Sequence, residues 1–329
     1  MMYTSPVTVG NVTIPNRIWL APMAGVSDLP FRLLCRRQGA GLAAMEMISA
    51  KAVCYGNRAT IGLMKTLPEE APVSLQLFGH EPEFMAEAVR RIEDEPYDLL
   101  DINMGCPVPK ITGNGEGSAL MRDPGLIEQL VRSAADNTRR PVTVKLRLGF
   151  DEGHKNVLEC ARAAEAGGAS AVAIHGRTRE QMYSGKADWT LIGEAVKELS
   201  VPVIGNGDVT DGVSAKKLFD ETGCAAVMVG RAARGNPWVF REILGYLDRP
   251  EHPEPARPDR EELARMILRH GALAVEYKGE LTAMREMRAH VAWYLSGFPG
   301  ASKLRAEAGQ LSSYRDLEVL VGKIFPPLD

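Results

Sequence analysis

The 329-residue sequence lacks several features that would assign it to particular classes of protein. No apolar run approaches the roughly 20 residues that a membrane-spanning helix needs, so we expect no membrane association. Residues 1–15 lack the basic start and apolar stretch of a signal peptide, which favours a cytoplasmic protein. The five cysteines (35, 54, 106, 160 and 224) form no Cys-x-x-Cys pair and no cluster with histidine at zinc spacing. We therefore expect neither disulfide bonds nor a metal site.

The sequence also lacks a large excess of charge of either sign. It has 39 Lys and Arg residues against 42 Asp and Glu residues, a formal net charge of -3. Such a chain has no overall attraction to nucleic acid, so any such binding requires a local basic face. With 45% hydrophobic and 25% charged residues, the composition is that of an ordinary soluble protein with room for one large domain and a small one.

What is present is a series of eight strand-like runs, each followed by a helical stretch. Most runs are continuously apolar, as expected for parallel strands that are buried on both faces. They cover residues 17–21, 41–47, 72–78, 97–103, 141–147, 169–175, 201–206 and 224–229. Eight such units over roughly 230 residues predict an α/β fold, a TIM (β/α)8 barrel. The rival fold, a doubly wound sheet, would need a Gly-x-Gly-x-x-Gly motif after an early strand to bind a dinucleotide, and none is found.

Two further segments flank the predicted barrel. Residues 7–14 alternate in polarity around a Gly-Asn pair, which indicates a small β-hairpin that closes the bottom of the barrel. Residues 249–258 contain four prolines, which neither a helix nor a central strand tolerates, so they indicate a linker. Helices are predicted beyond it at residues 260–277, 281–296 and 301–324. The expected domains are therefore a catalytic barrel over residues 1–247, a linker over 248–258 and an all-α domain over 259–329.

One cysteine follows a predicted strand directly. The apolar run that begins at Asp98 ends in Asn103, Gly105, Cys106 and Pro107, and glycine with proline releases the chain into a turn. Cys106 is therefore expected on a loop at the carboxyl end of a strand, where barrels carry their chemistry. Most free cysteines behave instead as small buried hydrophobic residues. Position alone leaves both roles open.

Polar residues end several of the predicted strands. In a barrel these side chains converge on one mouth, and each is costly to bury without a partner. The set comprises Gln76, Asn103, Lys145, Arg147, His175 and Asn206. Individually, each also has a structural explanation: Lys145 or Arg147, for example, could pair with Glu46 or Asp101. Together they suggest a polar ligand, and a lysine with a histidine suggests one that becomes anionic.

The last two predicted strands are followed by residues suited to a phosphate group. Asn206-Gly207-Asp208 follows the seventh run and Gly230-Arg231 follows the eighth, where barrels commonly bind phosphate through backbone N–H groups. Glycine lets the backbone approach the ligand, and arginine adds a charged fork. The alternative is that Arg231 forms a surface ion pair.

Four motifs together resemble the tRNA-dihydrouridine synthase family, and within it the bacterial B-type branch. They are Ala-Pro-Met-Ala-Gly-Val-Ser-Asp at residues 21–28, Asn-Met-Gly-Cys-Pro at 103–107, His-Gly-Arg-Thr at 175–178 and Gly-Asn-Gly-Asp at 205–208. Other flavin barrels share single elements, so the specificity lies in this order combined with the thiol. The resemblance runs from about residue 14 through the linker and reappears at residues 289–294.

The resemblance implies an FMN-dependent oxidoreductase that reduces uridine to 5,6-dihydrouridine in the D-loop of tRNA, with NADPH or NADH as electron donor. It implies that Cys106 is the proton donor. The implied FMN-binding residues are Pro22, Met23, Ala24, Gln76, Lys145, His175, Asn206, Gly207, Asp208, Gly230 and Arg231. The implied substrate-binding residues are Asn103, Arg147, Arg177, Arg285 and Arg288. The expected partner is tRNA, and the protein is expected to be a monomer or a weak oligomer.

Two other functions fit parts of the sequence. A flavin barrel that acts on a small molecule such as a dihydropyrimidine fits the core but leaves the helical domain without a role. A tRNA-binding chaperone without turnover is disfavoured because Cys106 and Lys145 are intact.

Two local features also have two interpretations. Arg285 and Arg288 share a helix face, which is suited to the tRNA backbone or to pairing with Glu280 and Glu286. Residues 110–118, with three glycines in five residues, are either a lid that orders on tRNA or a mobile surface loop. A lid of this kind would leave Cys106 without a fixed position in the free protein.

Overall fold

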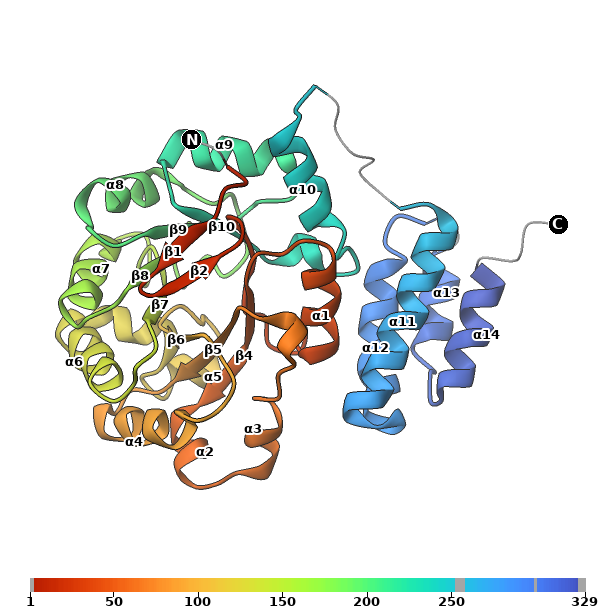
Figure 1. The fold of residues 1–329 in the computed structure, drawn as a ribbon, viewed down its shortest axis with the longest axis horizontal. Coiled ribbons are helices and arrows are strands. Elements are labelled where there is room, and N and C mark those ends of the chain that lie inside the picture. Colours follow the sequence, from red (N-terminus) through yellow and green to blue (C-terminus); the bar gives the residue numbers. More distant parts are fainter. Residues whose placement is uncertain (1–2, 252–257, 299–300, 325–329) are drawn as a thin grey trace.

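The computed structural model describes residues 3–251, 258–298 and 301–324 (Figure 1). Eight strands form a closed barrel in the order β10-β3-β4-β5-β6-β7-β8-β9, and every neighbouring pair is parallel. The strands are β3 (Ile18–Leu20), β4 (Ala43–Ser49), β5 (Val73–Phe78), β6 (Leu99–Asn103), β7 (Val142–Arg147), β8 (Ala171–His175), β9 (Val203–Asn206) and β10 (Ala226–Val229). The predicted TIM barrel is confirmed. Each strand lies within its predicted run, except that β4 extends beyond residue 47.

Helices surround the strands in Figure 1. They are α1 (Leu29–Arg37), α2 (Ala50–Cys54), α3 (Arg58–Gly62), α4 (Pro82–Ile92), α6 (Pro124–Ala135), α7 (Val157–Ala166), α8 (Thr190–Glu198), α9 (Gly212–Thr222) and α10 (Val239–Asp248). Helix α4 illustrates why they pack there, because Met85, Ala88, Val89 and Ile92 recur at helical spacing and all are buried. Each large apolar side chain buried in this way stabilises the fold by about 1.5–3 kcal/mol. Within the described ranges, no helix is long and apolar enough to cross a membrane.

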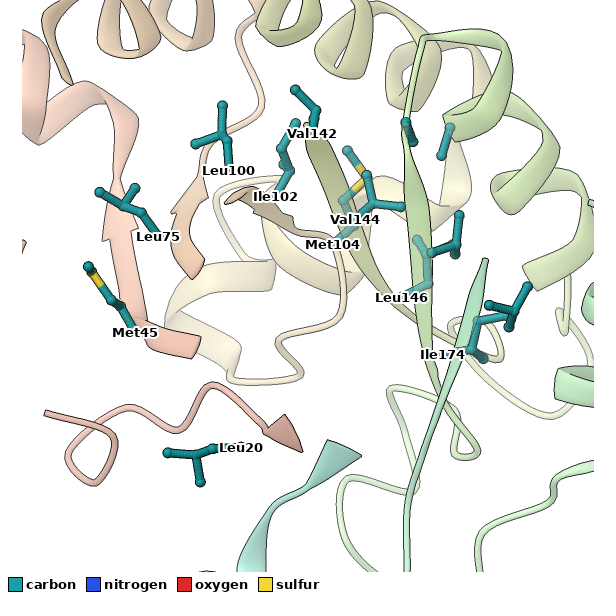
Figure 2. Close-up of a cluster of buried hydrophobic side chains, with 14 of the residues drawn as sticks. Leu20, Met45, Leu75, Leu100, Ile102, Met104, Val142, Val144, Leu146 and Ile174 are labelled. Carbon is teal, nitrogen blue, oxygen red and sulfur yellow. The ribbon is translucent and has the colours of Figure 1, made fainter. Parts of the chain in front are cut away.

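Successive side chains along each strand alternate between two environments. On β5, Leu75 and Leu77 point outward into the main core, whereas Ser74 and Gln76, also buried, lie on the other side. Figure 2 shows outward-facing side chains of neighbouring strands, such as Leu100, between the barrel and its helices. The inward positions near the carboxyl ends are therefore available for polar chemistry while the outward positions hold the fold together.

The N-terminal hairpin closes the bottom of the barrel, as predicted. Strands β1 (Val7–Val9) and β2 (Val12–Ile14) pair antiparallel. Their buried valine and isoleucine side chains join the apolar cluster that contains the inward-facing Ala171 and Ile204. At the turn, Gly10 has φ +57°, and a Cβ there would lie 2.6 Å from Pro141 Cγ. Glycine is thus required by both the turn and the close approach.

The C-terminal segment contains α11 (Arg260–Lys278), α12 (Glu280–Tyr294), α13 (Ala301–Ala308) and α14 (Tyr314–Ile324). The single helix predicted over residues 301–324 is wrong, because the chain turns between α13 and α14. Backbone N–H groups of Ser312 and Ser313 donate to the Asp316 carboxylate there, a local bonding pattern that competes with helix. Residues 252–257 of the predicted linker lie outside the described residues, and the domain boundaries remain a prediction.

The helical segment packs against one side of the barrel, next to α1 (Figure 1). Leu273 of α11 joins an apolar cluster with Leu29, Leu33 and Leu34 of α1. Nearby, Lys278 Nζ lies 2.6 Å from an Asp28 carboxylate oxygen. The barrel and the C-terminal helices therefore share both apolar and ionic contacts.

Candidate active site

A cavity of about 540 Å³ opens at the carboxyl ends of the barrel strands. The residues implied to bind FMN all line it: Pro22, Met23, Ala24, Gln76, Lys145, His175, Asn206, Gly207, Asp208, Gly230 and Arg231. Asn103, Cys106 and Arg147 line it as well. The barrel thus brings together residues that are more than 200 positions apart in the sequence.

Lys145 supplies positive charge to this cavity. Its Nζ donates to Asn206 Oδ1 at 2.9 Å, and Asn206 Nδ2 in turn donates to the Met228 carbonyl at 2.9 Å. Burial of the ammonium group, together with the nearby Arg147 cation, lowers the pKa of Lys145 to about 8. The lysine does not pair with Glu46 or Asp101, the structural alternative considered from the sequence. Its ammonium group retains donor capacity for an anionic ligand.

His175 is neutral in this environment. Burial and the surrounding Lys145 and Arg147 cations hold the pKa of the imidazole well below its ordinary value. Arg177 Nη1 lies 3.4 Å from His175 Nε2. Because a guanidinium has only donors, Nε2 faces it as an acceptor and the ring proton belongs on Nδ1.

Cys106 is held at the cavity wall by its own backbone. Its N–H donates to Asn103 Oδ1 at 2.9 Å, and its carbonyl accepts from the N–H and hydroxyl of Ser118 at 3.0 and 2.9 Å. The residue is only 8% exposed, and burial raises the pKa of the thiol. At neutral pH the group is therefore a protonated thiol, which can donate a proton but is a poor nucleophile.

The segment over residues 110–118 packs on Cys106 at its C-terminal end, through Gly117 and Ser118. It contains α5 (Pro109–Thr112) and the start of a 3-10 turn, η2 (Gly117–Arg122). Gly117 has φ +60°, and a Cβ there would lie 2.8 Å from the Cys106 carbonyl oxygen. Gly117 thus permits close packing on the Cys106 backbone, and Cys106 has a defined position.

Arg147 forms hydrogen bonds to two loops beside the cavity. Its Nε donates to the Gly105 carbonyl and its Nη1 to the carbonyls of Thr178 and Met182, each at 2.8 Å. The residue is 2% exposed, and burial lowers its pKa to about 10. Through Gly105, Arg147 therefore supports the loop that carries Cys106. The predicted role of Arg147 in substrate binding does not include this structural role.

The chain matches the family model described as Dihydrouridine synthase over residues 19–324. This chain belongs to the dihydrouridine synthase family. It is 40% identical over 307 residues to tRNA-dihydrouridine synthase B of Pseudomonas aeruginosa, covering 93% of this chain and 92% of that relative. It is also 39% identical over 328 residues to a probable tRNA-dihydrouridine synthase of Mycobacterium tuberculosis, covering 96% and 84%. The resemblance to the family and its B-type branch is confirmed.

Solved structures support the fold. Morphinone reductase in complex with tetrahydroNAD superposes with a TM-score of 0.55 at 13% identity, covering 79% of this chain and 93% of that chain. A 2-naphthoyl-CoA reductase complex superposes with a TM-score of 0.58 at 12% identity, covering 74% and 52%. At such low identity these likenesses concern the barrel fold alone.

Arg177 of this dihydrouridine synthase lies inside the protein, so the expected surface contact with tRNA is not available to it. The residue is 1% exposed, and its Nη2 lies 2.8 Å from Asp208 Oδ2. It also donates to the carbonyls of Ser184 and Gly185. Arg177 therefore ties the loop after β8 to the loop after β9.

Arg231 combines the two interpretations considered from the sequence. Its guanidinium lies 3.2 Å from Asp208 Oδ1, yet the residue lines the cavity and stays exposed. Beside it, Gly230 leaves open space, because a Cβ there would find no atom closer than Ala21 Cβ at 3.9 Å. This arrangement can admit a ligand next to the backbone.

Arg285 and Arg288 lie on α12, away from the cavity lining, and differ from each other. Arg285 is exposed, whereas Arg288 is half-buried and donates through Nε and Nη2 to the Leu311 carbonyl. Arg288 thus holds the turn that follows α13. Glu286 pairs with Lys278 and Glu280 with the Tyr314 backbone, so neither of the two expected arginine pairings is formed.

Sequence reasoning missed Tyr183 of this family member and considered Asp101 only as an ion-pair partner. Tyr183 lines the cavity, is 48% exposed, and has the guanidinium groups of Arg147 and Arg231 at 5.5 and 5.1 Å from its ring centroid. Nothing in the loop sequence indicates this stacking. Asp101 lies beneath the cavity. A carboxylate within an otherwise apolar strand is the sequence feature that could have indicated it.

In the described part of the chain, no group of His, Cys, Asp or Glu side chains is arranged to hold a metal ion.

Proposed function

We propose that this chain is an FMN-dependent tRNA-dihydrouridine synthase that reduces uridine to 5,6-dihydrouridine in the D-loop of tRNA, with NADPH as the reductant. The observation that carries the proposal is that the buried Cys106 thiol and the Lys145 ammonium group line the same cavity. The relatives named tRNA-dihydrouridine synthase support tRNA as the substrate. Three parts of the proposal rest on the family resemblance: modification in the D-loop of tRNA, the use of NADPH and a cytoplasmic location.

The cavity residues fit a flavin mononucleotide. Gln76, Lys145 and His175 supply polar groups for the edge of the ring, and Pro22, Met23 and Ala24 line its apolar side. The open space beside Gly230 and the exposed guanidinium of Arg231 suit the single phosphate group. When bound, FMN supplies the hydride for reduction of the uracil double bond.

The residues of the chain supply the remaining chemistry. The Lys145 cation would stabilise negative charge at the pyrimidine edge of a bound flavin. After hydride transfer to one uracil carbon, the Cys106 thiol donates its proton to the other carbon. The side-chain oxygen of Asn103 accepts a hydrogen bond from the Cys106 N–H. The main role of Asn103 is therefore to hold the proton donor in place.

The rim of the cavity suits an extruded base. A uracil inside folded tRNA must leave its stack to reach a barrel mouth, and aromatic and apolar groups then hold its exposed faces. Tyr183 lines the mouth and is exposed, as are the apolar side chains of Val108 and the nearby Met182. Arg285 on the helical segment is available for the phosphate backbone.

The experiment that tests this function compares oxidants of the reduced enzyme. Flavin released from the purified protein is identified by chromatography, and the photoreduced enzyme is then mixed anaerobically with unmodified tRNA or with free pyrimidines. We expect FMN, rapid reoxidation by tRNA and accumulation of dihydrouridine. Faster reoxidation by a free pyrimidine would favour the small-molecule flavin barrel instead, and FAD or no flavin after reconstitution would contradict the proposal.

A further inference from the structure

A chain of hydrogen bonds leads from the interior of the barrel to the Cys106 backbone. Thr143 Oγ1 donates to Asp101 Oδ1 at 2.6 Å, and Gln76 Nε2 donates to Asp101 Oδ2 at 2.6 Å. Asn103 Nδ2 then donates to Gln76 Oε1 at 2.9 Å, and the Cys106 N–H donates to Asn103 Oδ1 at 2.9 Å. All four side chains are buried, none being more than 9% exposed.

The backbone end of this chain determines the direction of both amides, and the carboxylate end agrees with it. The N–H groups of Gly105 and Cys106 are obligatory donors, so the Asn103 atom that faces them must be its oxygen. The Asn103 nitrogen consequently faces Gln76, whose oxygen must accept. The Gln76 nitrogen is then left to face Asp101, which accepts. A buried amide in the opposite orientation would oppose donor to donor, which costs free energy at each link.

We propose that Asp101 is a positioning residue: as the terminal acceptor it anchors the Gln76 and Asn103 amides in the barrel and thereby fixes the Cys106 loop. Asp101 lies outside the cavity lining, so it acts through its neighbours. The inference deepens the proposed function, because it explains how the proton donor is held. It assigns a role to a buried carboxylate that the reaction does not itself use.

The role requires an acceptor atom rather than a negative charge. Burial raises the pKa of the Asp101 carboxyl, against the opposing effects of Thr143, Gln76 and Lys145. An added proton would lie on Oδ1, where the Thr143 hydroxyl can accept it, because the Gln76 nitrogen cannot accept a hydrogen bond. Oδ2 therefore remains an acceptor in both protonation states.

Three single variants test the inference on the purified full chain. Asp101→Leu removes the acceptor, so the Gln76 nitrogen loses its buried partner and the two amides are held from the Cys106 end alone. Asp101→Asn keeps an acceptor oxygen for Gln76 and directs its nitrogen toward the Thr143 hydroxyl. Thr143→Val removes a buried hydrogen bond of Asp101 but leaves the order of donors and acceptors intact, which makes it the matched control for lost stability.

The readout is the rate at which Cys106 is alkylated by iodoacetamide, measured by peptide mass spectrometry so that other cysteines do not contribute. Without its anchor at Asp101, the Gln76–Asn103 pair should hold the Gly105 and Cys106 N–H groups less firmly, and the looser loop should raise this rate about tenfold in Asp101→Leu. We expect Asp101→Asn and Thr143→Val to stay within about twofold of the unsubstituted chain, since the amide order is kept. Thr143→Val and Asp101→Leu should both lower the melting temperature.

A comparison of one single and one double variant tests the proposal if Asp101→Leu fails to fold. Asn103→Asp brings a second acceptor to Gln76, which then cannot satisfy both carboxylates. Adding Asp101→Asn restores a complete chain in reverse order, with the new amide donating to Gln76. We therefore expect the double variant to be alkylated several-fold more slowly than Asn103→Asp alone.

The proposal is overturned by a folded Asp101→Leu variant that reacts at the unsubstituted rate. It is overturned equally by an Asp101→Asn variant that reacts as fast as Asp101→Leu, or by a double variant that shows no rescue. The alkylation rate does not depend on turnover. Failure of the proposed tRNA reaction would therefore leave this test unaffected, and the two outcomes are distinguishable.

Discussion

Lys145 Nζ on β7 lies 2.9 Å from Asn206 Oδ1 on β9. The amide is oriented for this contact, because its nitrogen is occupied by the Met228 carbonyl. Two features make the ammonium group sensitive to its surroundings: burial and the neighbouring Arg147 together lower its pKa to about 8. An anionic ligand in the cavity would stabilise the cation, so Lys145 should contribute strongly to flavin binding.

Replacing Lys145 with methionine should weaken FMN binding. Lys145→Met keeps most of the side-chain volume but removes the charge, and we expect the Kd of the apoprotein for FMN to rise about tenfold or more. Quenching of flavin fluorescence measures this Kd. Lys51→Met is the matched control, because Lys51 is an exposed lysine that pairs with Glu81 outside the cavity lining. Equal affinity in the Lys145→Met and unsubstituted proteins would remove Lys145 from the site.

The same lysine predicts how FMN binding depends on pH. With a folded-state pKa of about 8, the Lys145 ammonium group predominates below pH 8 and is lost above it. The affinity of the apoprotein for FMN should therefore fall as pH rises from 7 to 9.5, and this component should be missing in Lys145→Met. Parallel pH profiles for the two proteins would show that another group is responsible.

Two buried histidines predict a loss of stability in acid. His270 and His290 lie with ring centroids 4.3 Å apart where the helices pack on Phe31 of α1. Burial is the main cause of the lowered pKa of His290, about 4; Asp28 opposes the shift and Lys278 adds to it. Below its unfolded pKa near 6.5, His290 gains a proton only on unfolding. The free energy of unfolding should thus fall by up to about 2 kcal/mol between pH 6.5 and 5.

Urea denaturation at several pH values checks this expectation. His290→Gln should lose less stability than the unsubstituted chain over the same interval, because it removes one of the two titrating rings. His154→Gln provides the control, since His154 is exposed on a loop. If His290→Gln and His154→Gln show the same pH slope as the unsubstituted chain, the buried ring does not determine acid stability.

The two arginines of α12 should behave differently when replaced by alanine. Arg285→Ala removes an exposed charge, so the KM for tRNA should rise and the slope of log affinity against log salt concentration should shrink by about 1. Arg288→Ala removes the hydrogen bonds to the Leu311 carbonyl, so its main effect should be a lower melting temperature. An Arg285→Ala variant with unchanged KM and salt slope would show that this face of α12 does not contact tRNA.

The barrel was predictable because its outward-facing positions must be apolar. Leu75 and Leu77, or Val144 and Leu146, bury the contact with the helices, and the glycine and proline residues between the runs mark the turns. The cavity residues followed from the same register, because strand ends meet at one mouth. The contacts of the arginine side chains could not be predicted in this way. The sequence does not show that Arg177 points inward to Asp208 or that Arg288 meets a carbonyl 23 residues away.

The break after α13 was mispredicted, and the packing of Gly117 on Cys106 was not foreseen, for a related reason. Composition predicts conformational freedom but not the contact that removes it. Gly117 is used for close packing on Cys106, and Ser312 and Ser313 are used to satisfy Asp316. Such local contacts depend on neighbours that only the folded chain provides.

The central claim is that Cys106 donates a proton to the reduced uracil, and single-turnover oxidation of the reduced enzyme by unmodified tRNA tests it most directly. Cys106→Ala should retain FMN and its reduction by NADPH, but dihydrouridine formation should slow by about 10²- to 10⁴-fold, the usual contribution of a general acid. Cys106→Ser should rescue poorly, because a hydroxyl is a much weaker acid, and melting curves should exclude unfolding as the cause. Near-normal flavin reoxidation by Cys106→Ala, with dihydrouridine accumulating at the usual rate, would contradict the mechanism.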